Sequence, residues 1–414
     1  MLQNPFTPTE IASLPDDFFG RTDELRSLER SLILGSVAIQ GPIGIGKSSL
    51  LAQGLLKMEG FDSSHSARTI VAVADKDIND IEQAARMLVN SLVEVDEVQK
   101  RVKFKIGSFF ERESAEISRN FVDGKHLAIL KRLIEKEYLN HLLDEKAYLI
   151  LAIDEADKSP IALARLIRIV LTQTQQQGIK RLRFLLAGVS PFFQKMVDED
   201  TGVSRFFYQT ISLLPLTELE ATELLESKLS IAAKKAEEDG YEIRIAPEIV
   251  QHVVALSGGH PHILQLLGSH LIEHEDAEPD GVIDERDLVK SLRRICYEDR
   301  ARVYDSTLHN LDINLKLDTL RSLLHTVSAG FPTRIDKNVV ARLSEDGTVQ
   351  AEDIHWLIEH NVLANVSENE YGLIDEFLRI RMLMDRTESQ EAAEELEQRL
   401  IEQGSEEELN EDDV

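Results

Sequence analysis

Cysteine is almost absent from this chain, because only Cys296 among 414 residues carries a thiol. One thiol cannot form an internal disulfide, and the twelve histidines show no metal-ligand spacing with it, so a disulfide scaffold and a Cys/His metal site are excluded. No apolar run approaches the ~20 residues that a membrane-spanning helix needs. The start, "MLQNPFTPTE", lacks a basic stretch followed by an apolar one, so we expect no signal peptide and a cytoplasmic protein.

Positive charge is also scarce. The chain has 46 Lys and Arg against 74 Asp and Glu, a formal net charge of −28. Twelve of the carboxylates and a single arginine lie in 387–414. This composition predicts a solvated, disordered tail that ATPase chemistry does not need. The alternative is an acidic arm that competes with nucleic acid or docks on a basic partner.

A glycine-rich stretch, "GPIGIGKSSL" (41–50), lies between the apolar run "SVAIQ" and a helical segment. GxxxxGK[ST] between a strand and a helix predicts a phosphate-binding P-loop. Glycines let backbone N–H groups converge on phosphate oxygens, and the helix adds its positive end. We expect Lys47 to reach the β- and γ-phosphates of ATP and Ser48 to bind Mg²⁺. The predicted nucleotide-binding residues of this loop are Gly41, Pro42, Ile43, Gly44, Ile45, Gly46, Lys47, Ser48 and Ser49.

The stretch "YLILAIDEAD" ends an apolar strand in acidic residues. Ligands of α/β proteins bind at the carboxyl ends of the strands, so Asp154 is predicted to hold Mg²⁺ through its water shell. Glu155 is predicted to act as the general base on the attacking water. The alternative is that one acid only caps the next turn. The letters "DEAD" do not indicate a helicase, because no second RecA-like core follows.

Apolar strands alternate with amphipathic helices through residue 216, which predicts an α/β fold with a parallel five-stranded sheet. Residues 217–304 read as helices only, and 305–386 show helices followed by a short β-ribbon, the pattern of a winged helix. The expected strands are 36–40, 68–75, 147–154, 183–190 and 208–216. The expected domains are a nucleotide-binding core (1–216, with an insertion at 97–146), a helical lid (217–304), a winged-helix domain (305–386) and the acidic tail (387–414).

These motifs resemble those of the AAA+ ATPases, in the branch that holds archaeal initiator-like ATPases and the STAND ATPases. "FFGRTDELRSLERSL" (18–32) is similar to the segment before the P-loop in that branch, and the resemblance covers roughly 15–386. It implies that the backbone near Phe19, Gly20 and Arg21 borders adenine. "SGGHPHILQLL" resembles the lid motif and implies that Pro261 lies near the base.

The resemblance also implies two further catalytic residues. Ser190 stands where the family has a polar sensor, and the alternative is an ordinary serine at a strand end. Arg205 matches an arginine that reaches the γ-phosphate of a neighbouring subunit, which implies a homo-oligomer. The alternative for Arg205 is a surface arginine paired with Asp198, Glu199 or Asp200.

One position departs from the family. Many AAA+ lids carry a sensor arginine where this chain has His260, Pro261 and His262. The missing arginine favours the STAND-like alternative, with slow, switch-like turnover.

The charge of 301–386 argues against DNA binding by the winged helix, because it holds nine Lys or Arg and fourteen Asp or Glu. The recognition-helix position, "AEDIHWLIEHN", carries Glu352, Asp353 and Glu359 and no cation, whereas duplex binding depends on cations that neutralise phosphates. We expect Ile354 and Trp356 to pack the core of a protein-contact domain. Basic stretches at 100–112 and 180–184 are alternative nucleic-acid contacts.

The sequence therefore predicts an ATP-binding, slowly hydrolysing switch that relays its nucleotide state to an effector protein, without membrane contact. The alternatives are a DNA-binding ATPase of the initiator or transposition-regulator kind, and a scaffold that binds ATP without hydrolysing it. The resemblance associates such ATPases with prokaryotic defence or mobile-element regulation, whereas the residues themselves name no pathway.

Overall fold

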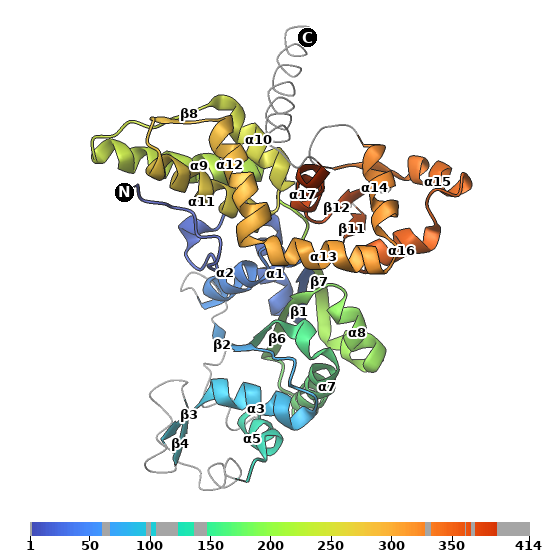
Figure 1. Cartoon of the computed structure of the whole chain (residues 1–414). Helices are drawn as coiled ribbons and strands as arrows, with labels where there is room; N and C mark the ends of the chain where they lie inside the picture. The colour runs from blue at the N-terminus through green and yellow to red at the C-terminus, as the bar shows by residue number, and fades with distance from the viewer. Residues whose placement is uncertain are drawn as a thin grey trace. The chain divides into compact units, whose positions relative to one another are not determined.

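The computed structural model describes residues 2–59, 67–96, 101–104, 123–135, 147–327, 333–360, 362–365 and 369–386 (Figure 1). The chain divides into two compact units, one of residues 11–214 and one that combines residues 1–10 with 215–414. The domain boundaries predicted at 216, 304 and 386 stay predictions, and the acidic tail lies outside the described residues. No described helix is both long enough and apolar enough to cross a membrane.

The unit 11–214 contains a parallel five-stranded sheet in the order β2-β5-β6-β1-β7. This confirms the predicted α/β fold. Its strands are β1 (Ser36–Gly41), β2 (Ala67–Val73), β5 (Tyr148–Asp154), β6 (Leu182–Val189) and β7 (Phe207–Ser212). The last strand ends earlier than predicted, because the chain leaves the sheet before Pro215, which has no N–H to donate.

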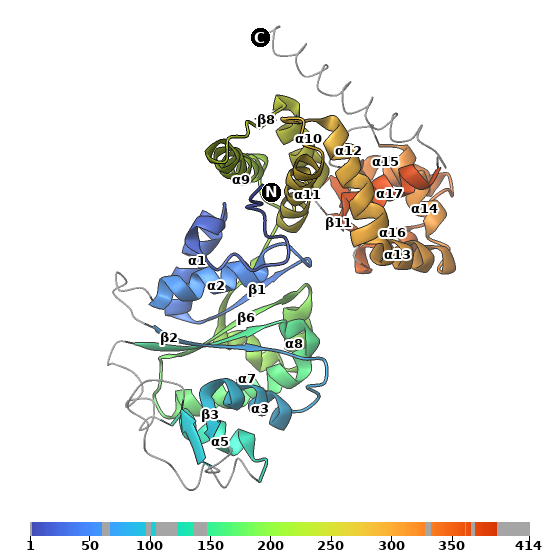
Figure 2. The same cartoon turned by 60° about the vertical axis from the view of Figure 1, so that its left-hand side comes forward.

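Helices cover both faces of this sheet, as Figure 2 shows. Alternate residues of β5 face opposite sides: Leu149, Leu151 and Ile153 pack in one cluster, and Ile150 and Ala152 in the other. This is why the strand is apolar at nearly every position. One face carries α1 (Thr22–Leu34) and α2 (Lys47–Glu59), and the other carries α3 (Ile81–Leu92), α5 (His126–Leu133), α7 (Pro160–Gln176) and α8 (Phe192–Glu199).

The predicted insertion at 97–146 is described only in part. Strand β3 (Val93–Asp96) pairs antiparallel with β4 (Arg101–Phe104), so "RVKF" forms a hairpin with the residues before it. Residues 97–100, 105–122 and 136–146 of this insertion lie outside the described residues.

The helical region after residue 216 contains α9 (Glu218–Glu238), α10 (Pro247–Ser257), α11 (Pro261–Ala277), α12 (Glu285–Arg294) and α13 (Ala301–Ile313). Two differences from the prediction occur here. Strands β8 (Arg244–Ile245) and β9 (Val282–Ile283) pair in parallel, so the region is not helical only; two residues each are too few to show a period. The stretch "DERDLVKSLRRICYEDRARVY" (284–304) has a helical pattern throughout and predicts one helix, but the structure has a π-helical turn (Ile295–Asp299) in it, after which Arg300 leaves helical geometry.

A small module closes the described chain. It has helices α14 (Leu317–His325), α15 (Lys337–Glu345), α16 (Ala351–Glu359) and α17 (Glu376–Arg386), and a sheet in the order β10-β12-β11. The strands are antiparallel: β10 (Ile335–Asp336), β11 (Leu363–Asn365) and β12 (Glu370–Leu373). The predicted helices followed by a small antiparallel sheet are therefore present. Ile354 is buried, and the ring of Trp356 stacks on His360 at 3.9 Å.

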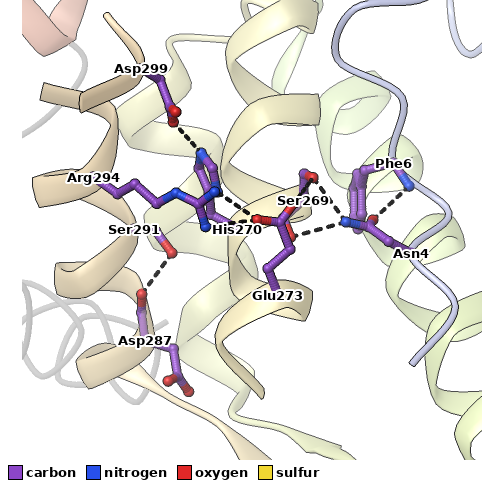
Figure 3. A network of polar contacts seen from close by, with 9 residues as sticks. All are labelled: Asn4, Phe6, Ser269, His270, Glu273, Asp287, Ser291, Arg294 and Asp299. Atoms are coloured by element: carbon purple, nitrogen blue, oxygen red, sulfur yellow. Dashed lines mark hydrogen bonds and ion pairs between the residues drawn. The ribbon is translucent and has the colours of Figure 1, made fainter. Parts of the chain in front are cut away.

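The N-terminal residues pack on α11, in the unit that contains the C-terminal half (Figure 3). The Asn4 amide donates to the Ser269 hydroxyl (2.8 Å) and carbonyl (3.2 Å). Phe6 is buried, and its ring lies where a Cβ atom on Gly268 would stand, 2.2 Å from Cε1. The Ser269 hydroxyl in turn donates a hydrogen bond to Glu273 (3.1 Å), and Glu273 forms an ion pair with Arg294 (2.7 Å). These contacts fix the segment to the helix.

We expect Gly268→Ala to lower the midpoint of thermal unfolding. Alanine normally stabilises a helix by about 1 kcal/mol relative to glycine. Here the new methyl group overlaps the Phe6 ring, and such overpacking costs roughly 1–3 kcal/mol. In a Phe6→Ala background the same substitution should raise the midpoint instead, because the ring is gone. Ser230→Ala, at an exposed position of α9, is the matched control. An equal effect of Gly268→Ala in both backgrounds would contradict the packing.

Candidate functional site

The glycine-rich loop joins the carboxyl end of β1 to the first residue of α2, Lys47. Gly44 and Gly46 have φ angles of 78° and 96°, which residues with a side chain rarely adopt. Ile45 between them is fully buried and holds the loop to the core. Ser48 lies in the first turn of α2, whose N-terminal end favours an anion. The backbone therefore has the strand–loop–helix form that binds phosphate.

The Lys47 ammonium lies within this loop and donates to the Pro42 carbonyl (2.6 Å). Burial lowers the pKa of Lys47, while the charges of Asp157, Asp154 and Glu155 act in the opposite direction. The lysine of the first motif and the acids of the second are thus brought into one electrostatic environment. Sequence spacing cannot show this, because more than a hundred residues separate them.

Asp154 ends β5, and its Oδ1 accepts from the Glu155 N–H (2.8 Å). Glu155 has a φ of 53° and an exposed side chain 4.0 Å from the Lys158 ammonium. A non-glycine residue in left-handed geometry is strained, and such strain gathers at functional sites. An exposed carboxylate at the strand end suits the predicted role of Glu155 as a general base.

Asp157 is a site residue that the sequence analysis did not single out. Its Oδ1 accepts a hydrogen bond from the Val189 N–H (2.9 Å) at the end of β6. Of the three acidic charges that act to raise the pKa of Lys47, that of Asp157 has the largest effect. A Cβ atom on Gly188 would lie 2.9 Å from the Asp157 nitrogen, so the turn after β5 packs tightly on β6. The only signal in the sequence was the third acid of "DEAD".

Strand register places Ser190 between the two motifs. Strand β6 lies between β5 and β1, and Gly41 pairs with Val189, one residue before Ser190. Ser190 is half-buried at the carboxyl edge of the sheet, where a polar sensor would lie. Its role as a sensor stays a prediction.

The residues before α1 also reach this loop. Phe19 and Gly20 are half-buried, and Arg21 is buried with its guanidinium donating to the Ile45 carbonyl (3.2 Å). The Ser49 hydroxyl accepts from the Ala12 N–H (3.1 Å), so this side chain has a protein partner. The family resemblance implied only backbone contacts with adenine at 19–21, and no motif in the sequence indicated the Arg21 side-chain contact.

Arg205 lies at the opposite edge of the sheet. Arg205 lies two residues before Phe207, which pairs with Ser36 at the start of β1. The P-loop begins at the other end of β1, at Gly41, about 17 Å from Ser36 along the strand. Arg205 therefore cannot contact a phosphate in its own P-loop. Its guanidinium lies 3.4 Å from the Thr172 hydroxyl and over the Phe206 ring, beside a cavity of about 440 Å³.

The acidic partners considered for Arg205 bond elsewhere: Asp198 accepts from Gln194 (2.7 Å), Glu199 from Arg165 (2.8 Å) and Asp200 from Arg168. In the structure, Arg205 therefore does not form a surface ion pair with Asp198, Glu199 or Asp200.

Pro261 opens α11, in the unit that does not contain the P-loop. Its predicted place near the base stays a prediction.

The basic stretch 180–184 has a structural role at Arg183. Its guanidinium donates to the Leu32 and Ile33 carbonyls, each at 3.0 Å, at the end of α1. The Arg183 guanidinium therefore bonds within the fold and does not face outward as a contact for nucleic acid.

The donor set suits Mg²⁺ bound together with a nucleotide. Ser48 and Asp154 offer a hydroxyl and a carboxylate, hard oxygen ligands of the kind Mg²⁺ prefers. Within the described residues, no group of three or more His, Cys, Asp or Glu side chains is arranged to hold a metal by itself. A site with two protein oxygens fits an ion that completes its shell with phosphates and water.

Several solved structures are similar to this chain. The ORC2 protein of Aeropyrum pernix has a TM-score of 0.55 at 15% identity, with 96% of this chain and 98% of that chain covered. A Walker-type ATPase of Pyrococcus abyssi has a TM-score of 0.57 at 17% identity, with 90% and 98% covered. At these identities the likeness shows the fold. The comparison with curated proteins finds no significant match.

A family model agrees with the motifs described above. The model of novel STAND NTPase 1 matches residues 11–282, which include the P-loop, both acids at the end of β5, and α11. The match covers more than half of the chain and includes the candidate residues of the nucleotide site described above. The chain therefore belongs to the novel STAND NTPase 1 family of nucleotide-binding NTPases.

Proposed function

We propose that this protein is an ATP-driven switch that hydrolyses its nucleotide slowly and passes the nucleotide state to a partner protein. The observation that carries the proposal is the convergence of Lys47, in the P-loop, with Asp154 and Glu155 at the carboxyl edge of the same sheet. This arrangement supports the proposal, because ATP hydrolysis needs a phosphate-binding group and a water-activating group in one environment.

In this mechanism Lys47 leaves the Pro42 carbonyl for the β- and γ-phosphates. Ser48 and Asp154 would hold Mg²⁺, which would neutralise charge on the phosphates. Glu155 takes a proton from water as the water oxygen bonds to the γ-phosphorus and the bond to the ADP oxygen breaks. Ser190 holds the γ-phosphate, and Arg205 of one subunit acts at the site of a neighbour in a homo-oligomer.

The difference between ATP and ADP states is the γ-phosphate, and a ligand shifts a switch only through its differential affinity for the two states. The missing lid arginine, replaced by the segment around Pro261, removes one γ-phosphate contact and supports slow turnover. We place the output in the module of α14–α17 and its sheet. Helix α16 has three carboxylates and no Lys or Arg, and the nearby Lys316 is engaged by Asp353 within the module, so this surface suits a protein effector better than a nucleic acid.

Two measurements test this function against its alternatives. Titration with a fluorescent ATP analogue and a phosphate-release assay should show binding and slow turnover; binding without phosphate release would favour the scaffold. Affinity for duplex DNA, with and without ATP, should be weak. An affinity that is high and falls steeply with salt would favour the initiator-type alternative, since counterion release gives DNA binding a strong salt dependence.

A further inference from the structure

The P-loop lies directly against the segment through which the chain leaves the unit 11–214. The Leu213 N–H donates to the Gln40 carbonyl (2.8 Å), one residue before the loop. A Cβ atom on Gly41 would stand 3.0 Å from both the Leu213 carbonyl oxygen and Ile45 Cγ2. Such contacts would be tighter than most Cβ contacts in proteins, so a glycine suits this close approach. Leu214 is the last residue of the unit.

One side chain joins the two segments. The Arg21 guanidinium is buried, and its Nη2 donates both to the Ile45 carbonyl (3.2 Å) and to the Leu214 carbonyl. Its Nη1 donates to Glu24 (3.1 Å), one turn along α1. The planar, forked guanidinium can serve several acceptors at once, which an ammonium group does less well. Arg21 thus bonds the middle of the P-loop to the end of the unit.

The backbone at this residue indicates that the side chain matters. Arg21 has a φ of 59°, in the left-handed region that glycine adopts at little cost, and Gly20 before it has a φ of 65°. Burying a cation also carries a desolvation cost, which the carbonyl and carboxylate partners must offset. A position that suits glycine for the backbone and yet holds a buried arginine points to a function of the guanidinium.

We propose that Arg21 is a positioning residue of the switch: it holds the Ile45 carbonyl of the P-loop and the Leu214 carbonyl together, so that phosphate binding and the course of the exit segment change as one. The proposal rests on the proposed function, since it takes ATP as the ligand. It goes beyond that function by naming the contact that carries the state of the loop to residues 213–214.

Substitutions can separate this role from a role in folding. Arg21→Gly removes the guanidinium and relieves the backbone strain, and Arg21→Lys keeps the charge without the fork. We expect both to raise the dissociation constant of a fluorescent ATP analogue about tenfold, since the bonds lost involve a charged donor. Arg26→Ala, at an exposed arginine of helix α1, which follows Arg21, should leave the constant unchanged.

Hydrogen exchange measures an effect of ATP on residues 207–216 that a change in folding stability alone would not alter. In the parent, ATP should slow exchange in the peptide that covers 207–216, through the Leu213 N–H bond to Gln40. In Arg21→Gly this gain should disappear although the nucleotide-free protein unfolds at the parent temperature. Should Arg21→Gly fail to fold, Arg21→Lys decides the question by the same measurements.

The two proposals fail in different ways. If the parent does not bind the analogue, the proposed function is wrong. If the parent binds it while both Arg21 variants bind equally well and keep the exchange response at 207–216, the role of Arg21 is wrong and the ATP switch stands.

Discussion

Glu155→Gln should leave ATP bound and lower its hydrolysis by about 10²–10⁴-fold, the usual contribution of a positioned general base. Lys47→Ala should instead abolish nucleotide binding. The difference follows from the roles that we propose for the two groups. The Lys47 ammonium, in the loop beside Pro42, is proposed to contact the phosphates in the ground state, and the exposed Glu155 carboxylate is proposed to act only on the attacking water. Titration with a fluorescent ATP analogue and single-turnover phosphate release measure the two effects separately.

Matched controls are available outside the site. Lys57→Ala removes an exposed lysine from the same helix α2, and Glu223→Gln removes an exposed carboxylate from α9; neither should change binding or hydrolysis. A Glu155→Gln protein that hydrolyses ATP at the parent rate would show that another group, such as Asp157, is the base.

Arg205→Ala should lower ATP hydrolysis by roughly 10³–10⁵-fold at concentrations where the parent is oligomeric, the range known for an arginine that stabilises a transferring phosphoryl group. Because Arg205 lies at the amino edge of the sheet, opposite its own P-loop, any phosphate that it contacts belongs to another subunit. The specific activity of the parent should therefore rise with protein concentration. Mixing Lys47→Ala with Arg205→Ala should restore part of the activity, since each subunit supplies what the other lacks.

Lys195→Ala removes an exposed cation from α8 and should not change the rate. Sedimentation with a non-hydrolysable ATP analogue should show association of the parent. A chain that stays monomeric with the analogue, with a specific activity independent of concentration, would remove Arg205 from the mechanism and leave it as the residue beside Thr172 and Phe206.

Much of the core could be predicted from local patterns. The five strands were found because each is an apolar run between turn signals, and β5 is apolar on both faces since helices cover both. The P-loop was found because its glycines and lysine are adjacent in the chain, and the structure has the positive φ angles that such glycines allow. The roles of the predicted site residues stay predictions.

Other features had no local signal. Strands β8 and β9 have two residues each, too few for a period, and the turn at Ile295–Asp299 interrupts a pattern that is helical throughout. The contacts of Arg21 with Ile45 and Leu214, and of Asp157 with Val189, join residues whose spacing follows no motif.

By itself the sequence determined the fold class, the phosphate-binding loop and the acidic charge of the chain, since each depends on neighbouring residues or on composition. Only the tertiary structure decided that residues 2–8 pack with the C-terminal unit, that Arg21 bonds the P-loop to the end of the core, and that Arg205 lies too far from its own loop to act there. These features depend on strand order, register and long-range packing, in which residues far apart in the chain become neighbours only after the sheet has formed.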